Sequence, residues 1–442
     1  MSVLIVLAGL LAYRGGGGGA WLFDDQVAIL GNESIRQVWP LSKLLSPPAD
    51  TPIARRPLLT PRFAPRYGGA SLWLAGAVAG LWAVHPLLTE SILYITQRTE
   101  LLMALWYLLA LYSLIRSADS SHPARWHALT VLACALGMLS KEVMVTAPLV
   151  LCLYDWMFLA QSWPTLWVRR GRLYVGLALT WGVLAWLMVT GGRTSPAGLA
   201  LRELPLARSL ATQAGVILYY ARLAVWPHPL VIDYGDWPMA ASVAAMWPQM
   251  LAVALLILAT GYGLIRRAPW AFLPAWSLAI LAPTSLLPIL TEVAAERRMY
   301  LPLIGVVALA VFGVEALRRR LRLSPRSAGA VIGIAVFACG ASTWRRSLDY
   351  RSDVAMWTDA VVKRPNNVRA HDNFGLALGR DDDAIAHFRD ALSADPKHAK
   401  AEYNLGLALA RQGQQAEAVT HLRQAAGLRP DIATPTSPSA WR

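Results

Sequence analysis

The sequence predicts an all-α protein, in which a polytopic transmembrane helical domain is followed by a short module of paired helices. Hydrophobic residues make up 56% of the 442 residues and charged residues only 15%, which is far from the composition of soluble globular domains. The apolar residues gather in about ten runs of roughly 17 to 25 residues, each long enough to cross a bilayer. Beyond Trp344 these runs stop and charged residues become frequent. We therefore place the membrane domain at residues 1–345, with about 10–11 spans.

The apolar runs set the order of the predicted helices. They begin near Ser71, Ser91, Trp126, Val143, Leu173, Ser209, Gln249, Trp270, Met299 and Ala328. The stretch from Met1 to Tyr13 is apolar but too short to cross a bilayer alone. Between Leu173 and Trp226 the number of runs does not fit strictly alternating crossings, so we expect the segment from Leu199 to Arg208 to lie along the membrane interface.

The net charge of +14 could suggest a nucleic-acid partner, but the arginines gather in short loops between the apolar runs. The four groups are Arg116 and Arg125; Arg169, Arg170 and Arg172; Arg266 and Arg267; and Arg318, Arg319, Arg320, Arg322 and Arg326. Positive charge concentrates in the cytoplasmic loops of membrane proteins, so we place these loops in the cytoplasm and expect no nucleic acid. The span near Ala328 then puts the C-terminal module on the extracytoplasmic side. We expect an integral protein of a bacterial inner membrane.

Two stretches near the C-terminus repeat one pattern, beginning at Ala370 and at Ala401. They match Gly375 with Gly406, Ala377 with Ala408, Ala384 with Ala418, and Pro396 with Pro430. A period of about 34 residues is typical of tetratricopeptide repeats. The segment from Asp353 looks like the second helix of a still earlier repeat. We therefore predict about two and a half repeats at residues 346–430, with a groove for a peptide, and a disordered tail at residues 431–442.

Three polar motifs at the ends of spans fall on the same predicted side as the repeats. They are HPLLTESILYITQRTE at His85, SKE at Ser140 and ERRMYLP at Glu296. Asp24 and Asp25 follow the first apolar stretch and join them on that side. Adjacent carboxylates there could take a proton from an acceptor hydroxyl or hold a divalent cation. The alternative is two solvated acids at the interface.

The charged side chains of the first two motifs leave alternatives open. Glu90 and Arg98 are eight residues apart and share a helix face. Arg98 could neutralise a phosphate, or it could pair with Glu90 or Glu100. Lys141 and Glu142 could serve a ligand or form an ordinary ion pair at a helix end.

The third motif has the densest charge on this side, with Glu296, Arg297, Arg298 and Tyr300 close together. Positive residues are disfavoured on the outer side of a membrane. The two arginines therefore need an anionic partner, which is either Glu296 or a ligand.

Together these motifs resemble one family, the transmembrane and tetratricopeptide repeat proteins, which are protein O-mannosyltransferase-like members of the C-type glycosyltransferase superfamily. The other matching pieces are FDDQVAILGN at Phe23 and RRPLLT at Arg55, in the same order along nearly the whole chain. The resemblance implies a polytopic fold of the C-type glycosyltransferase kind. It also implies an inverting enzyme that moves a sugar, such as mannose, from a polyprenyl-phosphate donor to a hydroxyl of a protein or glycan acceptor on the extracytoplasmic side.

The resemblance also implies roles for residues of this chain. Asp24 or Asp25 would be the catalytic base, and the same pair would hold any divalent cation; the need for a cofactor stays open. The remaining candidates bind the lipid phosphate or the sugar, or orient the residues that do so: Arg56, His85, Glu90, Arg98, Lys141, Glu142, Glu296, Arg297, Arg298 and Tyr300.

One departure from the family bears on catalysis. Family members have a further span between the RPL motif and the helix that leads to HP, whereas RFAPRYGG joins them directly here. A deletion of that span could impair the enzyme. The alternative function is a non-catalytic membrane scaffold that recruits a protein partner through its repeats.

Overall fold

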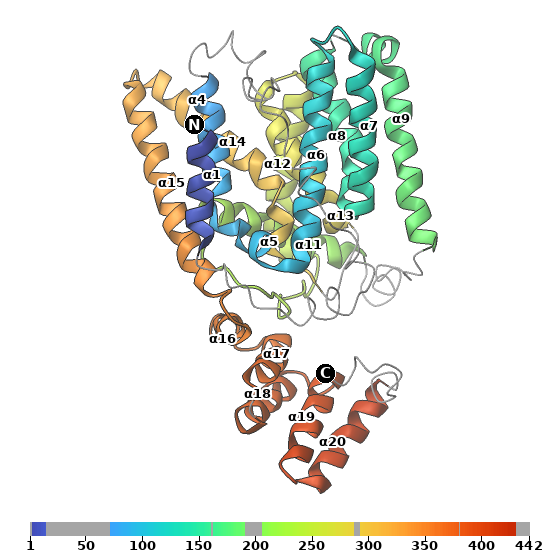
Figure 1. Ribbon diagram of the computed structural model, residues 1–442, viewed down its shortest axis with the longest axis vertical. Coiled ribbons are helices and arrows are strands. Elements are labelled where there is room, and N and C mark those ends of the chain that lie inside the picture. Colours follow the sequence, from blue (N-terminus) through green and yellow to red (C-terminus); the bar gives the residue numbers. More distant parts are fainter. Residues whose placement is uncertain are drawn as a thin grey trace.

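The computed structural model contains helices and no strands within the residues it describes, which are 2–14, 71–160, 162–190, 206–286, 292–379 and 381–429. The predicted all-α fold class is confirmed. The helices form a bundle of long elements and a smaller stack of short ones, joined end to end (Figure 1). The predictions for Asp24, Asp25, Arg56 and the tail at residues 431–442 fall outside the described residues.

The bundle is built from long helices that are connected by short helical turns. The long helices are α1 (Ser2–Tyr13), α4 (Ser71–Ala83), α6 (Arg98–Ser117), α7 (Pro123–Ser140), α8 (Ala147–Tyr154), α9 (Trp163–Thr190), α11 (Leu206–Val225), α12 (Trp247–Ile265), α13 (Phe272–Leu286), α14 (Pro302–Arg320) and α15 (Pro325–Leu348). The turns that matter for the site are η7 (Pro86–Leu88), α5 (Thr89–Leu93), η8 (Ile95–Gln97), η9 (Glu142–Thr146) and η13 (Glu296–Met299). Proline stands in the first turn of α7, α12, α14 and α15, where its missing N–H costs no helical hydrogen bond.

Five described segments are long and apolar enough to cross a membrane, namely Ile95–Ser117, Glu142–Leu159, Trp163–Thr190, Ala244–Ile265 and Pro325–Leu348. The pair Ser71–Ala83 and Pro86–Leu93, bent by 54°, would make a sixth. The bend falls at His85, whose extended backbone is the conformation favoured before a proline. The number of about 10–11 spans for the whole membrane domain stays a prediction.

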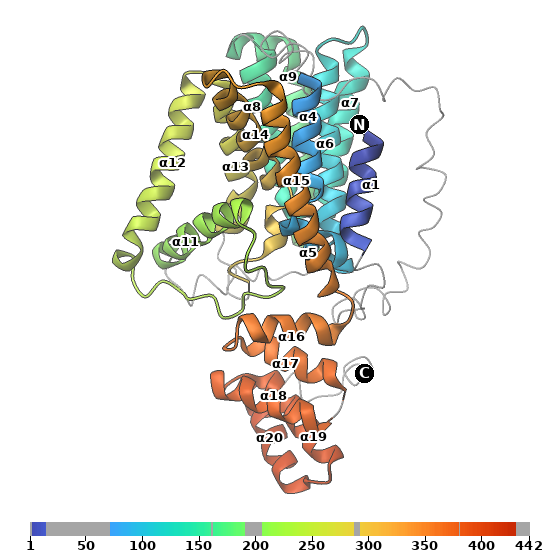
Figure 2. The same cartoon turned by 90° about the vertical axis from the view of Figure 1, so that its left-hand side faces the viewer.

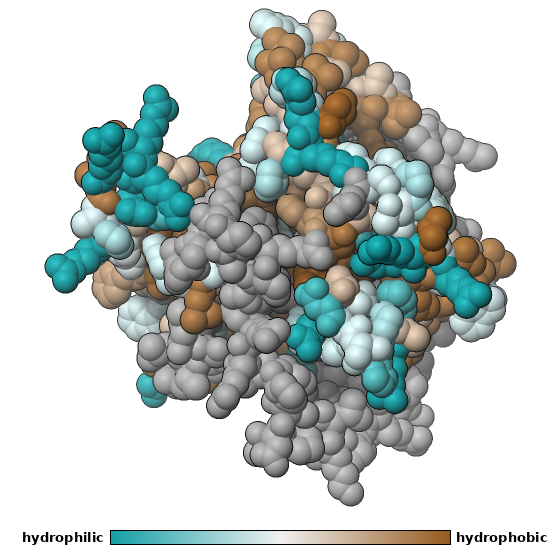
Figure 3. Space-filling model, turned by 90° about the horizontal axis from the view of Figure 1, so that it is seen from above, coloured by the Kyte–Doolittle hydropathy of each residue, from teal (hydrophilic) through white to brown (hydrophobic). Residues whose placement is uncertain are grey.

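The arginine groups and the repeat module lie at opposite ends of the bundle. The places where α6 meets α7, α8 meets α9, α12 meets α13, and α14 meets α15 lie at the end of the bundle opposite the short helices (Figures 1 and 2). Arg169, Arg170 and Arg172, which were expected in a loop, fall within the first part of α9. Figure 3 looks onto this end, where hydrophilic side chains stand in separate groups. The four arginine groups therefore share one end, and the C-terminal module lies at the other.

Helix α11 lies across the bundle rather than along it (Figure 2). Its polar residues Thr212 and Gln213 are buried and bind backbone groups, with Ala240 N donating to Thr212 Oγ1 at 3.0 Å and Gln213 Nε2 donating to Val293 O at 3.1 Å. The apolar run that begins near Ser209 thus forms a crossbar at the bundle end that faces the short helices. Because α11 lies across the bundle, it does not count as a crossing. The remaining long helices from α6 to α15 then run alternately in opposite directions, and no apolar run is left over (Figures 1 and 2).

Close packing of α13 against α14 fixes the start of α14. An added Cβ at Gly305 would lie 2.5 Å from Leu273 O and 2.5 Å from Ser277 Oγ, so only a glycine allows this approach. Ser277 Oγ also donates to Pro302 O at 2.7 Å. Because η13 directly precedes α14, these contacts hold the ERRM turn against the end of the bundle.

The short helices form the repeat module, whose members are α16 (Asp353–Lys363), α17 (Val368–Leu378), α18 (Asp381–Ala394), α19 (Ala399–Arg411) and α20 (Gln415–Leu428). The two predicted repeats correspond to α17 with α18 and α19 with α20, and the predicted half repeat is α16. Their matched glycines lie at the helix crossings: a Cβ at Gly375 would lie 2.5 Å from Phe388 Cε1, and one at Gly406 would lie 2.8 Å from Leu422 Cγ.

The module docks on the loop that joins α11 to α12. Asn367 Nδ2 donates to Asp233 Oδ1 at 3.0 Å, and Arg364 Nη1 donates to Asp236 Oδ1 at 2.7 Å. Buried side chains of α16 and α17 share a hydrophobic core with the membrane domain, whereas α18, α19 and α20 form a separate core. The first part of the repeat module is therefore continuous with the bundle.

Candidate functional site

A polar cavity of about 200 Å³ lies at the end of the bundle that faces the repeats. Its walls come from η8, α6, the SKE motif, α13 and η13, so residues of all three polar motifs meet there. The lining residues are Gln97, Glu100, Lys141, Glu142, Val143, Ile280, Thr284, Glu292, Arg297 and Arg298. Of the predicted site residues, the structure thus brings Lys141, Glu142, Arg297 and Arg298 into one cavity.

Arg297 reaches from this cavity to a fully buried carboxylate behind it. Arg297 Nη1 donates to Glu90 Oε1 at 2.6 Å, and the backbone N–H of Arg297 donates to Glu90 Oε2 at 3.0 Å. The guanidinium also pairs with Glu292. Although burial opposes ionisation of Glu292, Arg297 lowers the pKa of that carboxyl. Two acids therefore hold this cation in place at the wall of the cavity.

Lys141 pairs with Glu100 across the cavity, and this contact joins the SKE motif to α6. Glu142, next in the chain, is exposed at the cavity. Lys141 therefore forms an ordinary ion pair at the end of α7, with Glu100 rather than Glu142 as its partner. Arg98 is exposed and does not line the cavity, and the acids considered as its partners, Glu90 and Glu100, bind other cations.

Glu296 does not neutralise the arginines beside it. Its Oε1 accepts from Val231 N at 2.5 Å and from Tyr234 Oη at 2.7 Å, and both donors belong to the loop between α11 and α12. Its Oε2 is buried without a hydrogen-bond partner in the described structure. Burial raises the pKa of Glu296 to about 7, against the opposing effect of Arg346. This carboxyl therefore links the ERRM turn to the loop on which the repeat module docks.

The other predicted residues form the surroundings of the cavity. His85 is buried; its Nδ1 accepts from Leu87 N at 3.2 Å and its Nε2 lies 3.1 Å from Ala224 O, so it caps η7 and ties it to α11. Arg298 donates to the carbonyl groups of Glu292 and Val293. The ring of Tyr300 packs edge-on against Trp82, with centroids 5.1 Å apart.

Five lining residues were not predicted from the sequence as part of the site: Gln97, Val143, Ile280, Thr284 and Glu292. Glu292 had a usable signal, since it stands four positions before Glu296 in a segment that also carries two arginines. Thr284 lies in an apolar helix and offers no comparable signal. Three cationic and three acidic side chains line the cavity, so an entering phosphate would compete with Glu100 and Glu292 for Lys141 and Arg297.

A second, apolar cavity of about 720 Å³ lies inside the bundle, between α4, α6, α8, α13 and α14. It extends from Trp82, near the end that faces the repeats, to Trp270 at the basic end. Almost all of its lining is aliphatic or aromatic. Such a cavity suits a long hydrocarbon chain and has little to offer a polar ligand.

The acids of the polar cavity do not come together as a metal site. In the described part of the chain, the group of histidine and acidic side chains that are close enough together to bind one metal ion lies in the repeat module. The predicted cation site at Asp24 and Asp25 lies outside the described residues.

Comparisons with known proteins agree with the motifs. A family model described as tetratricopeptide repeat matches residues 399–432. Protein O-mannosyl-transferase TMTC4 of Homo sapiens is 27% identical over 352 residues, covering 70% of this chain and 47% of the relative. Protein O-mannosyl-transferase Tmtc3 of Drosophila melanogaster is 27% identical over 372 residues, covering 70% and 39%. Protein O-mannosyl-transferase F38B6.6 of Caenorhabditis elegans is 27% identical over 330 residues, covering 69% and 43%.

These relatives confirm the resemblance to the transmembrane and tetratricopeptide repeat family. The chain spans less than half the length of each of these three relatives. No solved structure matches it. The three relatives are animal proteins, and the bacterial inner membrane stays a prediction.

Proposed function

We propose that this chain is a membrane glycosyltransferase that moves a sugar from a polyprenyl-phosphate donor to a hydroxyl of a protein acceptor, on the side of the membrane that carries the repeats. Mannose is the sugar to test first, because the relatives are named protein O-mannosyl-transferases. The observation that supports this function most is the polar cavity, where three motifs distant in sequence meet and two of them contribute the cations Lys141, Arg297 and Arg298, next to an apolar cavity between the helices.

In this proposal the phosphate of the donor lies in the polar cavity. Lys141, Arg297 and Arg298 would bind its oxygens, and their charge would stabilise the leaving phosphate as the glycosidic bond breaks. The isoprenoid chain would occupy the apolar cavity, which is lined by Trp82. Trp82 Nε1 donates to the carbonyl oxygen of Tyr300 at 2.9 Å, and Tyr300 stands two residues after Arg298 of the polar cavity. The pairing of Lys141 with Glu100 and of Arg297 with Glu90 keeps these cations oriented before the donor arrives.

The chemical step needs a base, and the candidates for it, Asp24 and Asp25, lie outside the described residues. Asp24 or Asp25 would take the proton of the acceptor hydroxyl, whose oxygen attacks the anomeric carbon while the bond to the phosphate oxygen breaks. The products are the O-glycosylated acceptor, with inverted configuration, and the polyprenyl phosphate. A divalent cation, if one is needed, would bind the same two carboxylates.

The repeat module would present the acceptor. It lies at the same end of the molecule as the polar cavity and is joined to it through the loop that binds Glu296 (Figure 1). Helical repeats commonly bind extended peptides along a groove, and a protein substrate supplies such a peptide.

The test is transfer of radiolabelled mannose from polyprenyl-phosphate donors to endogenous protein, in membranes that contain the full chain. We expect incorporation by the unmodified chain, loss of incorporation in the Asp24→Asn, Asp25→Asn double variant, and a decrease of about 100-fold in Lys141→Gln. The matched control is Arg266→Gln, an exposed cation at the opposite end of the bundle, which should retain full activity.

The outcomes separate the two functions considered for this chain. No incorporation from any sugar donor by folded, membrane-inserted protein would support the scaffold instead, or an enzyme disabled by the deletion that the comparison of motifs suggests. Equal activity of Lys141→Gln and Arg266→Gln would show that the polar cavity does not hold the donor phosphate.

A further inference from the structure

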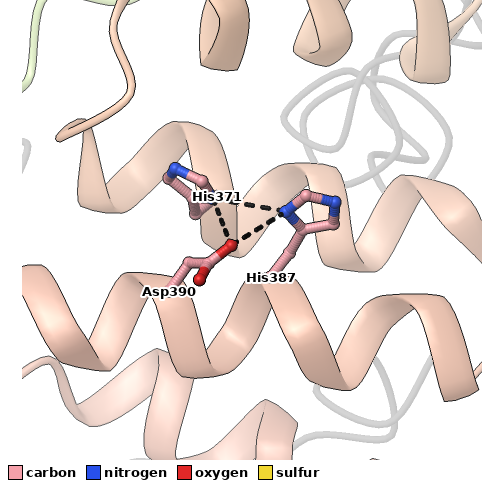
Figure 4. Close-up of side chains that lie close together, drawn as sticks. All are labelled: His371, His387 and Asp390. Carbon is pink, nitrogen blue, oxygen red and sulfur yellow. Dashed lines mark hydrogen bonds and ion pairs between the residues drawn. The ribbon is translucent and has the colours of Figure 1, made fainter.

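Three potential metal ligands lie close together between α17 and α18, the two helices of the first complete repeat. His371 lies on α17, and His387 and Asp390 lie three residues apart on α18, so they share one face of that helix. Figure 4 shows the three side chains turned toward one another across the helix crossing. None of the three belongs to the polar motifs, and the glycosyltransferase proposal does not use them.

The distances between the facing atoms suit three ligands around a single metal ion. His371 Nδ1 lies 3.3 Å from His387 Nδ1, and Asp390 Oδ2 lies 3.6 Å from both nitrogens. Atoms at these separations leave a point roughly 2.0 Å from each of them, which is the length of zinc bonds to imidazole and carboxylate. From these observations, we propose that the repeat module binds one zinc ion through His371 Nδ1, His387 Nδ1 and Asp390 Oδ2.

The surroundings of His371 support the choice of its Nδ1 as a ligand. Its other nitrogen, Nε2, lies 2.9 Å from Pro365 O, and a carbonyl oxygen can only accept. Nε2 therefore carries the proton, and Nδ1 has a free lone pair. A hydrogen bond from the second ring nitrogen to a backbone carbonyl is the usual way in which proteins orient a metal-binding histidine.

Hydrogen bonding alone explains only part of this arrangement. A shared proton between the two imidazoles would account for their approach, but Asp390 Oδ2 is too far from either nitrogen for a hydrogen bond. A metal ion accounts for all three distances together. The side chain of Asp390 is 56% exposed, that of His387 25% and that of His371 7%, so an ion can enter from solvent and a water can complete its coordination.

The ion would hold α17 and α18 together near their crossing. Phe388 packs over Gly375 there, and the three ligands face each other beside this contact (Figure 4). Because α17 belongs to the core of the membrane domain and α18 to the separate outer core, zinc would fix the outer repeats to the part that is docked on the bundle.

The experiment is calorimetric titration of zinc chloride into the full chain, purified in detergent without a histidine tag and treated with a chelator. We expect one zinc per chain. His371→Gln and His387→Gln should each weaken binding by more than the roughly 10- to 100-fold that loss of an outer-shell partner costs. Cobalt(II) in place of zinc should give the visible absorption bands of a tetrahedral site, and these bands should be absent from both variants.

The matched control is His421→Gln, which removes another partly buried histidine of the same module that lies beside carboxylates but not beside a second imidazole. It should bind zinc as the unmodified chain does. If the unmodified chain binds no zinc, or if His421→Gln and His387→Gln weaken binding equally, there is no such site. Circular dichroism verifies folding, and if His371→Gln does not fold, His387→Gln decides the result because its ring is more exposed.

Discussion

Replacing Glu296 by glutamine tests the raised pKa of this carboxyl, which links the candidate site to the loop between α11 and α12. The pKa of Glu296 rises from 4.5 to about 7, mainly through burial. Because the pKa is higher in the folded chain than in the unfolded one, folding favours the protonated form. The stability that this group contributes is complete below pH 4.5 and is lost as the pH rises through about 7.

The size of this effect follows from the change in pKa. One pKa unit corresponds to 1.36 kcal/mol, so the rise from 4.5 to about 7 corresponds to about 3 kcal/mol of unfolding free energy lost between pH 4.5 and 8. Glutamine has nearly the same shape but cannot ionise, so this part of the pH dependence should disappear in Glu296→Gln. Its amide nitrogen would replace the unpartnered Oε2, at a cost of about 1–3 kcal/mol that does not depend on pH.

The measurement is thermal unfolding of detergent-purified protein from pH 5 to 8, followed by tryptophan fluorescence. The melting temperature of the unmodified chain should decrease over this range more steeply than that of Glu296→Gln. The control is Glu142→Gln, which removes an exposed acid of the same region and should keep the steep profile. Parallel profiles for the unmodified chain and Glu296→Gln would refute the argument.

Two further substitutions test the packing around the site and in the repeats. Arg297→Gln leaves Glu90 buried without its cation, which should cost about 3–5 kcal/mol, whereas Arg266→Gln should change stability by no more than about 0.5 kcal/mol; similar melting temperatures for these two variants would contradict the buried pair. Gly375→Ala places a Cβ 2.5 Å from a ring carbon on α18 and should cost about 1–3 kcal/mol, whereas Gly427→Ala enters open space and should stabilise α20 by up to about 1 kcal/mol. Chemical unfolding of the full chain measures both, and an equal loss in the two alanine variants would show that the helix crossing can relax.

Hydrophobic run length and loop charge were enough to predict the class of fold and the two ends of the bundle. They were not enough for α11, whose apolar run begins like a span. Its orientation is set by partners far along the chain, since Gln213 binds Val293 O across 80 positions of sequence. The repeat period was readable because Gly375 and Gly406 meet a steric demand that recurs at the same point of each repeat.

For the candidate site, the sequence predicted which motifs meet but not how their charges pair. Counting spans places HPLLTES, SKE and ERRMYLP at one end of the bundle, because each crossing reverses the side of the chain. The pairing of Glu90 with Arg297, 207 residues away, depends on the rotation of each helix about its axis and on helix offsets of a few ångströms. Hydropathy carries no information on helix rotation or offset. The sequence therefore could not favour Arg297 over Arg98, which is nearer in sequence, as the partner of Glu90.

The docking of the first repeat helices has a consequence for anyone who builds chimeras of this chain. The period of the sequence suggests that the whole repeat array could be exchanged for another at residue 346. However, Ala360 and Ala370 lie in the core of the membrane domain together with Val231 and Tyr234, and both of these residues donate hydrogen bonds to Glu296. A graft at residue 346 would therefore remove one wall of that core. A transplant that begins after Gly379 would leave α16 and α17 in place and exchange only the helices that form a core of their own.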